Sequence, residues 1–463
     1  MTPPRFTPEE LAQATAGRWE GPPPPALEGL STDSRKPSPG SCFVALRGER
    51  FDGHAFVAEA ARAGARAAVV AEGAEVSAAG LPLLRVGDTL AALGAIARLH
   101  RRRFRIPLVA VTGSNGKTTT REMAAAILAT RGPVLRSEGN LNNEVGVPLT
   151  LLRLAAEHTA AVVEMGMSHP GEIGRLAAIA EPQVGVVTNA TPAHLAGLGT
   201  VEAVADAKAE LYQGLPPGGV AVANADDPRM LRRAQASGRR LLTFAVGRGR
   251  RGDVVVLEIL SHAADGLAFL LGIGNRELEV RIPLVGAHNA ANAAAAAAAA
   301  VALGCSDREI VRGLAEVRPV GRRLRLDRLP CGAVLVDDCY NANPASMSAA
   351  LRTLADLAAA SGSHPVAVLG DMLELGPVEA EAHRALGAEA ARAGVRLLGA
   401  FGPRSREVLA SARAAGLPEE AGFHSEEVEP LAAFLRARIG PGDVVLVKGS
   451  RGMRLERLIE ALR

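Results

Sequence analysis

The sequence predicts an α/β protein of three domains: a small amino-terminal α/β domain, a central parallel-sheet domain with a phosphate loop (P-loop), and a carboxy-terminal Rossmann-like domain. Three observations support this prediction. The 463 residues exceed what one hydrophobic core usually organises. An apolar run at 108–111 ends in a glycine-rich loop followed by a helical pattern. Predicted strands and helices alternate along most of the chain, as parallel sheets require.

The amino-terminal domain is expected at residues 1–86, and a helix that Asp88 caps should lead out of it. Its predicted elements are a helix at 8–16, a strand at 42–46 and a helix at 54–63. Ahead of that strand, hydroxyls, a carboxylate and two cations lie together, and such a group can hold a sugar phosphate or a uracil. An ordinary turn explains the cluster equally well. The cluster consists of Ser31, Thr32, Asp33, Ser34, Arg35 and Lys36.

The central domain, residues 87–316, begins with the P-loop sequence VAVTGSNGKTTTR at 109–121. Glycines let backbone N–H groups approach phosphate oxygens at the start of a helix. We expect Lys117 to reach the terminal phosphates and Thr118 to offer its hydroxyl to Mg²⁺. The usual first glycine is replaced by Val111, and a plain glycine-rich turn is the alternative interpretation. The predicted nucleotide-binding residues are Gly113, Ser114, Asn115, Gly116, Lys117, Thr118 and Thr119.

Further polar residues follow other predicted strands of the central domain. Glu164 ends one strand, and His194 follows the end of another. Ligands gather beyond the carboxyl ends of parallel strands, so both are candidate Mg²⁺ ligands, although a structural role explains a single histidine equally well. Asn140, Asn142 and Asn143 crowd one loop. Caps and turns account for one or two of them, and three indicate a polar contact surface.

Lysine is rare in this chain. Of the 52 basic residues only Lys36, Lys117, Lys208 and Lys448 are lysines. If arginine serves wherever charge alone is needed, lysine should persist where its compact, deprotonatable amine is required. Lys208 lies in a predicted helix at 201–215, where a surface ion pair would be the simpler explanation.

The end of the central domain and the third domain, residues 317–463, extend the alternation. Segments 254–260, 267–272 and 278–283 resemble antiparallel strands, and an alanine-rich helix follows. The third domain has predicted strands at 333–337, 366–369, 397–401 and 444–447, with helices between them. It lacks G-x-G-x-x-G, so no dinucleotide is inferred. Polar loops at 337–344, 370–376 and 448–452 should share the sheet edge that faces the nucleotide.

Composition excludes several functional classes. The formal charge is only +3, from 52 basic and 49 acidic residues, which argues against nucleic acid as a partner. No segment is typical of a secretory signal or of a membrane span. Cys42, Cys305, Cys331 and Cys339 show no C-x-x-C spacing. We therefore expect free thiols and a cytoplasmic location.

Six motifs in order resemble those of the Mur ligase family. TGSNGKTTT is typical of the whole family. The other five resemble those of the members that add D-alanyl-D-alanine to UDP-N-acetylmuramoyl-tripeptide in the last cytoplasmic step of peptidoglycan-precursor synthesis: GNLNNEVGVPLTLL, EMGMSHPGEI, DDCYNANPASM, VLGDMLELG and KGSRGMRLE. The resemblance covers the whole chain and implies a monomeric, three-domain, ATP-dependent ligase. The first domain would bind the UDP-sugar, the second ATP, and the third ATP and D-Ala-D-Ala.

The resemblance also implies roles for individual residues. Ser31, Asp33, Ser34 and Arg35 would face UDP, and Asn140, Asn142 and Asn143 the muramoyl peptide. Thr118, Glu164 and His194 would hold two Mg²⁺ ions together with Lys208, carbamylated by CO₂. Asn289, Arg322 and Asp338 would lie at the adenine, terminal phosphate and ribose of ATP, and Asn341, Asn343 and Lys448 near the amine substrate.

The implied chemistry begins with attack of the tripeptide carboxylate on the γ-phosphate of ATP. The resulting acyl phosphate is then attacked by the amine of D-Ala-D-Ala. Because arginine stays protonated, only a lysine could form the carbamate. Three alternatives stay open: a Mur-type ligase that adds a diamino acid, a ligase of the folylpolyglutamate synthase type, and a P-loop ATPase switch that ligates nothing.

Overall fold

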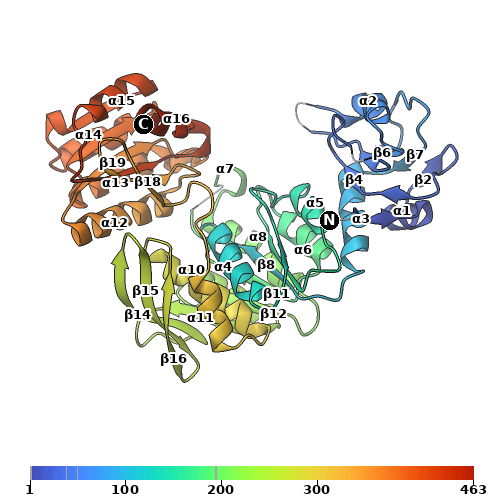
Figure 1. Ribbon diagram of the computed structural model, residues 1–463, viewed down its shortest axis with the longest axis horizontal. Coiled ribbons are helices and arrows are strands. Elements are labelled where there is room, and N and C mark those ends of the chain that lie inside the picture. Colours follow the sequence, from blue (N-terminus) through green and yellow to red (C-terminus); the bar gives the residue numbers. More distant parts are fainter. Residues whose placement is uncertain (1–2, 38, 49–50, 193–194) are drawn as a thin grey trace.

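The computed structural model describes residues 3–37, 39–48, 51–192 and 195–463. Three α/β domains follow one another along an extended molecule, with the amino-terminal and carboxy-terminal domains at opposite ends and the central domain between them (Figure 1). This confirms the predicted fold class. None of the helices in the described part of the chain is long and apolar enough to span a bilayer.

The amino-terminal domain contains a five-stranded sheet in the order β2-β7-β6-β5-β4 and a small β1-β3 pair. All pairings of the larger sheet are parallel except β2 with β7. Helix α3 then leads into the central domain from its N-cap Asp88, as expected. The elements are β1 Arg5–Phe6, α1 Pro8–Thr15, β2 Arg18–Glu20, β3 Leu27–Glu28, β4 Leu30–Ser31, β5 Cys42–Val44, the 3₁₀ helix Gly53–Phe56, α2 Val57–Arg62, β6 Ala67–Ala71, β7 Leu83–Val86 and α3 Thr89–Arg101.

The central domain is built on a nine-stranded sheet in the order β16-β15-β14-β13-β12-β11-β8-β10-β9. The strands from β9 to β14 are parallel, and β14, β15 and β16 form the predicted antiparallel extension. The strands are β8 Leu108–Thr112, β9 Val134–Arg136, β10 Ala160–Glu164, β11 Val184–Val187, β12 Val220–Asn224, β13 Arg240–Val246, β14 Val254–Ala263, β15 Gly266–Ile273 and β16 Arg276–Ile282.

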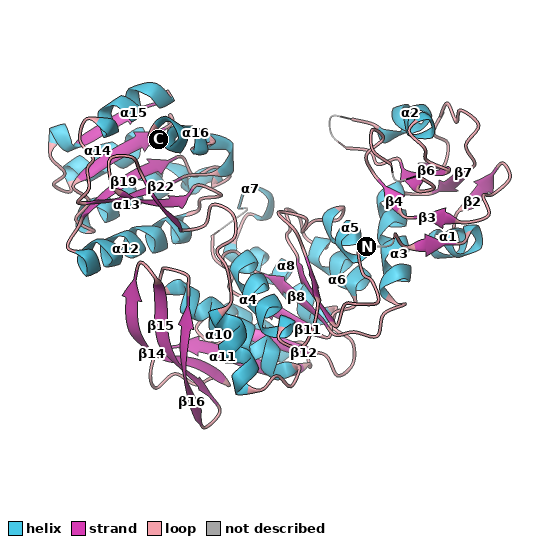
Figure 2. Ribbon diagram, viewed as in Figure 1, coloured by secondary structure: helices cyan, strands magenta, loops and turns pink. Residues whose placement is uncertain are grey.

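Helices cover both faces of this sheet (Figure 2). On one face α4 packs against α10, whose run of alanines from Ala293 to Ala300 is buried. Small side chains allow α4, α10 and the sheet to approach one another closely. The helices are α4 Lys117–Ala129, α5 Gly146–Leu151, α6 Glu172–Ala180, α7 Leu195–Leu198, α8 Val201–Gln213, α9 Pro228–Ala236, α10 His288–Ala302 and α11 Asp307–Ala315.

The carboxy-terminal domain has a six-stranded sheet in the order β17-β18-β22-β19-β20-β21. Both edge strands, β17 and β21, were missing from the sequence prediction because they are short and largely polar. The strands are β17 Arg325–Arg328, β18 Val334–Asp338, β19 His364–Gly370, β20 Leu397–Phe401, β21 Gly422–Ser425 and β22 Asp443–Lys448. The helices are α12 Pro344–Ser361, α13 Glu379–Arg392, α14 Arg406–Ala414, α15 Val428–Arg436 and α16 Glu456–Ala461, with 3₁₀ turns at Gly376–Val378, Glu419–Ala421 and Arg451–Met453.

The polar loops that follow β18, β22 and β19 lie at one edge, as predicted, because these strands are parallel neighbours. Two of the loops face the central domain. The third, at 370–376, does not line the cavity there. Its Asp371 accepts hydrogen bonds from the backbone N–H and the hydroxyl of Ser405, at 2.8 and 2.7 Å, so it stabilises the carboxy-terminal domain itself.

Candidate active site

A cavity of about 1020 Å³ lies where the central and carboxy-terminal domains meet. It is lined by the P-loop, by the loops that follow β10, β11 and β18, by Lys208 of α8, and by Lys448 at the end of β22. Three of the chain's four lysines lie on its wall: Lys117, Lys208 and Lys448. The scarcity of lysine therefore pointed to one place in the folded protein.

The P-loop leaves β8 in a conformation that requires glycine at two positions. Gly113 has φ +148°, and a Cβ there would lie 1.8 Å from the hydroxyl oxygen of Thr188. Gly116 has φ +81°, and its Cβ would lie 2.2 Å from the side-chain oxygen of Asn292. Val111, in contrast, is a buried residue inside β8. The motif position where the usual first glycine would stand therefore lies within the strand, and the essential glycine comes two residues later.

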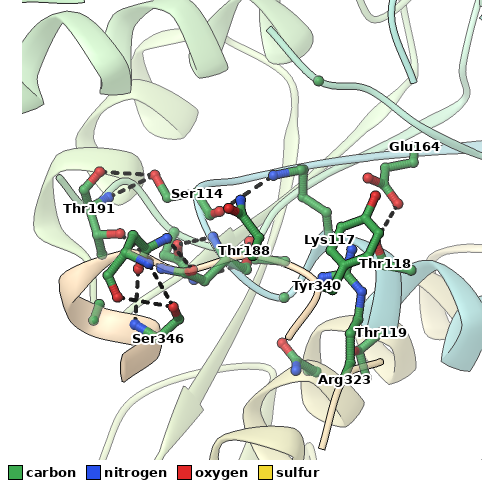
Figure 3. A pocket seen from close by; sticks show the side chains of 18 of the residues that line it. Ser114, Lys117, Thr118, Thr119, Glu164, Thr188, Thr191, Arg323, Tyr340 and Ser346 are labelled. Carbon is green, nitrogen blue, oxygen red and sulfur yellow. Dashed lines mark hydrogen bonds between the residues drawn. The ribbon is translucent and has the colours of Figure 1, made fainter. Parts of the chain in front are cut away.

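Hydrogen bonds tie the P-loop to the loop that follows β11 (Figure 3). The Ser114 hydroxyl donates to the Thr191 carbonyl at 3.0 Å, and the Thr188 hydroxyl donates to the Asn115 carbonyl at 2.6 Å. The backbone N–H of Asn115 donates to the side chain of Asn189 at 3.0 Å. These contacts fix the loop's shape before any ligand binds, as a phosphate site requires.

Lys117 and Thr118 start helix α4 at the floor of the cavity. The Lys117 ammonium donates to the Gly113 carbonyl at 2.8 Å, so its amine lies beside the loop backbone. Removal from water lowers the pKa of Lys117, against an opposing effect of Glu164. The Thr118 hydroxyl donates to Glu164 Oε2 at 2.8 Å (Figure 3). Glu164 Oε1 accepts from Asn142 Nδ2, also at 2.8 Å. One carboxylate thus joins the P-loop to the asparagine-rich loop.

Lys208 lies on α8 and is 2 % exposed. Among the residues that the structure describes, no carboxylate forms an ion pair with it. Burial holds the pKa of its amine well below the ordinary value, and the positive charge of Lys117 lowers it further. The surface ion-pair interpretation of this lysine is therefore wrong. Two residues on, Glu210 accepts hydrogen bonds from the N–H groups of Gly171 and Gly174 and so anchors α8 to the start of α6.

The carboxy-terminal domain contributes a second cluster. The Lys448 ammonium donates to Asp338 Oδ2 at 2.6 Å and to the Asn341 carbonyl at 3.0 Å. Burial raises the pKa of Asp338, and Lys448 acts against that shift. The Arg323 guanidinium lies over the Tyr340 ring, 4.0 Å from its centroid (Figure 3). Both of these side chains line the cavity.

Most of the predicted site residues of these two domains line the same cavity, including Asn289, which is buried. Asn140 is exposed and does not line it. Arg322 lies in a neighbouring cavity, where it pairs with Asp337 at 2.8 Å, while the adjacent Arg323 faces the P-loop side. His194 lies outside the described residues.

The candidate UDP residues lie in the amino-terminal domain, apart from the cavity described above. Arg35 forms a fork with Asp33 through bonds of 2.9 and 2.8 Å, which lowers the pKa of Asp33 to about 2. The Ser31 hydroxyl donates to the Asp33 carbonyl at 3.0 Å, and that of Ser34 donates to Glu59 at 3.3 Å. The cluster is thus a polar turn that presents a charged pair to solvent.

The donor atoms near Thr118 fit a magnesium ion that arrives with a nucleotide. Within the described ranges, no three or more His, Cys, Asp or Glu side chains are grouped to hold a metal by themselves. Mg²⁺ usually binds one or two protein oxygens and takes its other ligands from phosphates and water. The Thr118 hydroxyl and the Glu164 carboxylate are such hard donors.

The sequence interpretation missed several residues of this site. Thr188 and Thr191 could have been found, because they follow the end of β11, where parallel sheets place ligands. Arg323 is adjacent to Arg322, the arginine that the family resemblance indicated. Arg121 gave no signal, because its helical position looks exposed in the sequence, yet it is 1 % exposed in the fold.

Comparisons with known proteins agree along the whole chain. Residues 26–101 match the Mur ligase family catalytic domain, residues 111–300 the Mur ligase middle domain, and residues 321–451 the Mur ligase glutamate ligase domain. The UDP-N-acetylmuramoyl-tripeptide--D-alanyl-D-alanine ligase of Escherichia coli is 38 % identical over 441 residues, which cover 94 % of each chain.

Solved structures show the same relationship. A crystal structure of MurF from Acinetobacter baumannii superposes with a TM-score of 0.91 at 33 % identity, covering 100 % of this chain and 99 % of that one. MurF ligase from Thermotoga maritima in complex with ADP gives a TM-score of 0.83 at 30 % identity, over 94 % and 96 % of the two chains. The chain therefore belongs to the Mur ligase family.

Proposed function

We propose that this protein is an ATP-dependent ligase that joins D-alanyl-D-alanine to UDP-N-acetylmuramoyl-tripeptide. The observation that carries the proposal is the cavity in which the P-loop, Glu164 and Lys208 of the central domain face Asp338 and Lys448 of the carboxy-terminal domain. The full-length similarity to ligases of that name supports it. The cytoplasm, which supplies both ATP and UDP-linked precursors, is the proposed location.

The reaction needs an activated carboxyl group, because a carboxylate by itself has no good leaving group. In the proposed first step the tripeptide carboxylate attacks the γ-phosphate of ATP, and ADP leaves from the new acyl phosphate. Backbone N–H groups of the P-loop and the Lys117 ammonium would hold the phosphates. The D-Ala-D-Ala amine then attacks the acyl carbon, phosphate leaves, and the nitrogen loses a proton.

Magnesium would neutralise charge on the phosphates during this transfer. Thr118 and Glu164 would hold it, with His194 as a further proposed ligand. We also propose that Lys208 carries a carbamate, whose oxygens would bind a second ion. Burial supports this, because it favours the neutral amine that reacts with CO₂. The carbamate would place an anion beside the metals, at the position of the buried amine.

The remaining substrate contacts are assigned by domain. The polar turn with Ser31, Asp33, Ser34 and Arg35 would bind UDP, and Asn142 and Asn143, which line the cavity, would bind the muramoyl peptide. For ATP, Asn289 would lie at the adenine, Asp338 at the ribose and Arg322 at the terminal phosphate. Since Arg322 pairs with Asp337 of its own domain, that role would require this pair to open, whereas Arg323 already faces the cavity.

The test is ADP release measured with the matching UDP-precursor and either D-Ala-D-Ala or a diamino acid. We expect turnover only with UDP-N-acetylmuramoyl-tripeptide and D-Ala-D-Ala together, and a mass gain of the UDP-precursor that depends on ATP. Turnover only with the diamino acid would identify a different Mur-type ligase. Hydrolysis of ATP that ignores both substrates would instead favour an ATPase switch.

A further inference from the structure

A buried chain of charged side chains lies beneath the P-loop. Arg121, in α4, is 1 % exposed, and Glu164, at the end of β10, is 2 % exposed. Arg121 Nη1 donates to Glu164 Oε2 at 3.1 Å. Its Nε and Nη2 both donate to Glu122 Oε1, at 2.9 and 2.6 Å. The guanidinium is therefore fixed by one carboxylate and reaches the other with its remaining nitrogen.

Both oxygens of Glu164 are held. Oε2 accepts from Thr118 and Arg121, Oε1 accepts from Asn142, and the backbone N–H of Glu164 donates to the Ser137 hydroxyl at 3.0 Å. Among the described residues, Arg121 is the cation that pairs with this carboxylate. A carboxylate with these contacts keeps one orientation, toward the Thr118 hydroxyl.

We propose that Arg121 is a positioning residue, which holds Glu164 toward Thr118 and thereby sets the affinity of the site for Mg²⁺ bound with nucleotide. This inference rests on the nucleotide-binding and metal-binding part of the proposed function. Residues behind a metal ligand orient it, and their loss usually weakens metal affinity 10- to 100-fold. Stability alone is a weak reason for the arrangement, because buried ion pairs often stabilise no better than apolar residues would.

The competing explanation is charge balance: two buried glutamates need a nearby cation, whatever its shape. Arg121→Lys separates the two explanations. It keeps the charge, but a single ammonium cannot reproduce the planar fork that joins Glu122 to Glu164. Positioning predicts a defect in this variant, and charge balance predicts none.

The experiment measures binding of β,γ-imido-ATP by calorimetry, first in EDTA and then in rising Mg²⁺. In Arg121→Lys we expect the gain in affinity due to Mg²⁺ to fall about tenfold, while affinity in EDTA stays within about twofold of the unmodified protein. A Mg²⁺ gain within about twofold of the unmodified value would overturn the proposal. Because binding is measured, absence of ligation in the unmodified protein would refute the proposed function without affecting this result.

A matched control is Arg131→Lys. Arg131 also forms a fork with a glutamate, Glu309, at 2.8 and 2.9 Å, but this pair is partly exposed and lies away from the cavity. We expect no change in the Mg²⁺ gain there. If Arg121→Lys does not fold, Glu122→Gln serves instead, since it weakens the anchor of Arg121 and keeps an acceptor oxygen. A smaller loss of the Mg²⁺ gain is expected, and an unchanged gain would count against the proposal.

Discussion

The side-chain amide of Asn343 donates a hydrogen bond to the side-chain oxygen of Asn115 at 2.8 Å. Asn115 belongs to the P-loop, and Asn343 is the N-cap of α12 in the carboxy-terminal domain. The same Asn343 side chain accepts from the Ser346 N–H at 2.9 Å, so it caps its helix and contacts the P-loop at once. The loop expected to hold phosphates is thereby joined directly to the domain expected to bring the amine.

Asn343→Asp separates these two roles. Aspartate caps a helix as well as asparagine does, but it has no N–H to donate to Asn115. One neutral hydrogen bond contributes about 1 kcal/mol, which corresponds to a roughly fivefold shift toward separated domains. Distance distributions between labels on the central and carboxy-terminal domains should broaden accordingly, with little change in melting temperature. An unchanged distribution would show that this contact does not hold the domains.

A second contact joins the same domains and provides a control for that experiment. His262, on β14, lies 3.2 Å from Asp356 on α12, and its other ring nitrogen accepts from the Gly286 N–H at 2.8 Å. Asp356→Asn removes the charge from a partner far from the P-loop. If each variant broadens the distance distribution and the double variant shows the sum of the two effects, the two contacts act independently.

The order of strands and helices could be predicted from the sequence because each domain repeats one strong pattern. A buried parallel strand is a short apolar run, and polar residues directly after it lie at one edge whatever the helices do. That argument placed Glu164, Asp338 and Lys448 correctly on one cavity. It failed for the loop at 370–376, because a polar loop at the right edge can also be used to hold its own domain together.

Burial of charge could not be predicted in the same way. Arg121 and Lys208 both lie in amphipathic helices, where charged side chains are expected to face water. The fold buries both, since α4 and α8 lie between the sheet and other elements. The scarcity of lysine and the family resemblance singled out Lys208, and no comparable signal existed for Arg121 because arginine is common in this chain.

Lys208→Ala should reduce ligation at least 100-fold, because the other two lysines of the cavity are engaged elsewhere: Lys117 donates to the Gly113 carbonyl, and Lys448 donates to Asp338. Short carboxylic acids such as formate or acetate should restore part of the rate, since their carboxylate can occupy the space of the missing carbamate. The measurement is ADP release dependent on D-Ala-D-Ala, with and without added acid.

The matched substitutions for that experiment are Lys208→Arg and Lys36→Ala. Arginine keeps the positive charge but cannot react with CO₂ at neutral pH, so we expect Lys208→Arg to lose as much activity as Lys208→Ala. Lys36 is exposed and lies outside the cavity, so any loss of activity in Lys36→Ala should not be restored by added acid. Full activity of Lys208→Arg would contradict the carbamate.

Thiol labelling should distinguish one cysteine from the other three. Burial raises the pKa of Cys42 and of Cys339 to about 12 and also raises that of Cys305, while Cys331 is exposed. A thiol with a pKa near 12 is about one part in 10⁴ thiolate at pH 8, and only the thiolate reacts. Native protein at pH 8 should therefore release about one equivalent of thionitrobenzoate per chain from Ellman's reagent. The Cys331→Ser variant should release almost none. Four equivalents are expected in guanidinium chloride, and rapid labelling of a second native thiol would contradict the buried positions.

Asp52 should make the free energy of unfolding depend on pH in the acidic range. Its carboxylate accepts from the His54 backbone N–H at 3.0 Å and also contacts the His54 ring, and these bonds lower the pKa of Asp52 to about 2. The unfolded chain binds this proton more readily, near 3.8. Asp52 therefore stabilises the fold above pH 3.8, and the contribution is lost as pH falls toward 2.

Asp52→Asn keeps the cap and removes the charge, so it should destabilise the protein by less than about 1 kcal/mol at pH 6, because the carboxylate is partly exposed. The difference from the unmodified protein should shrink progressively below pH 4. Urea unfolding at pH 6, 4 and 3, followed by circular dichroism, measures it. Asp265→Asn is the control, because Asp265 lies at an exposed turn and its side chain forms no ion pair or hydrogen bond with the described residues; it should show no pH-dependent difference. A difference that stays constant from pH 6 to 3 would mean that titration of Asp52 contributes nothing to the pH dependence of stability.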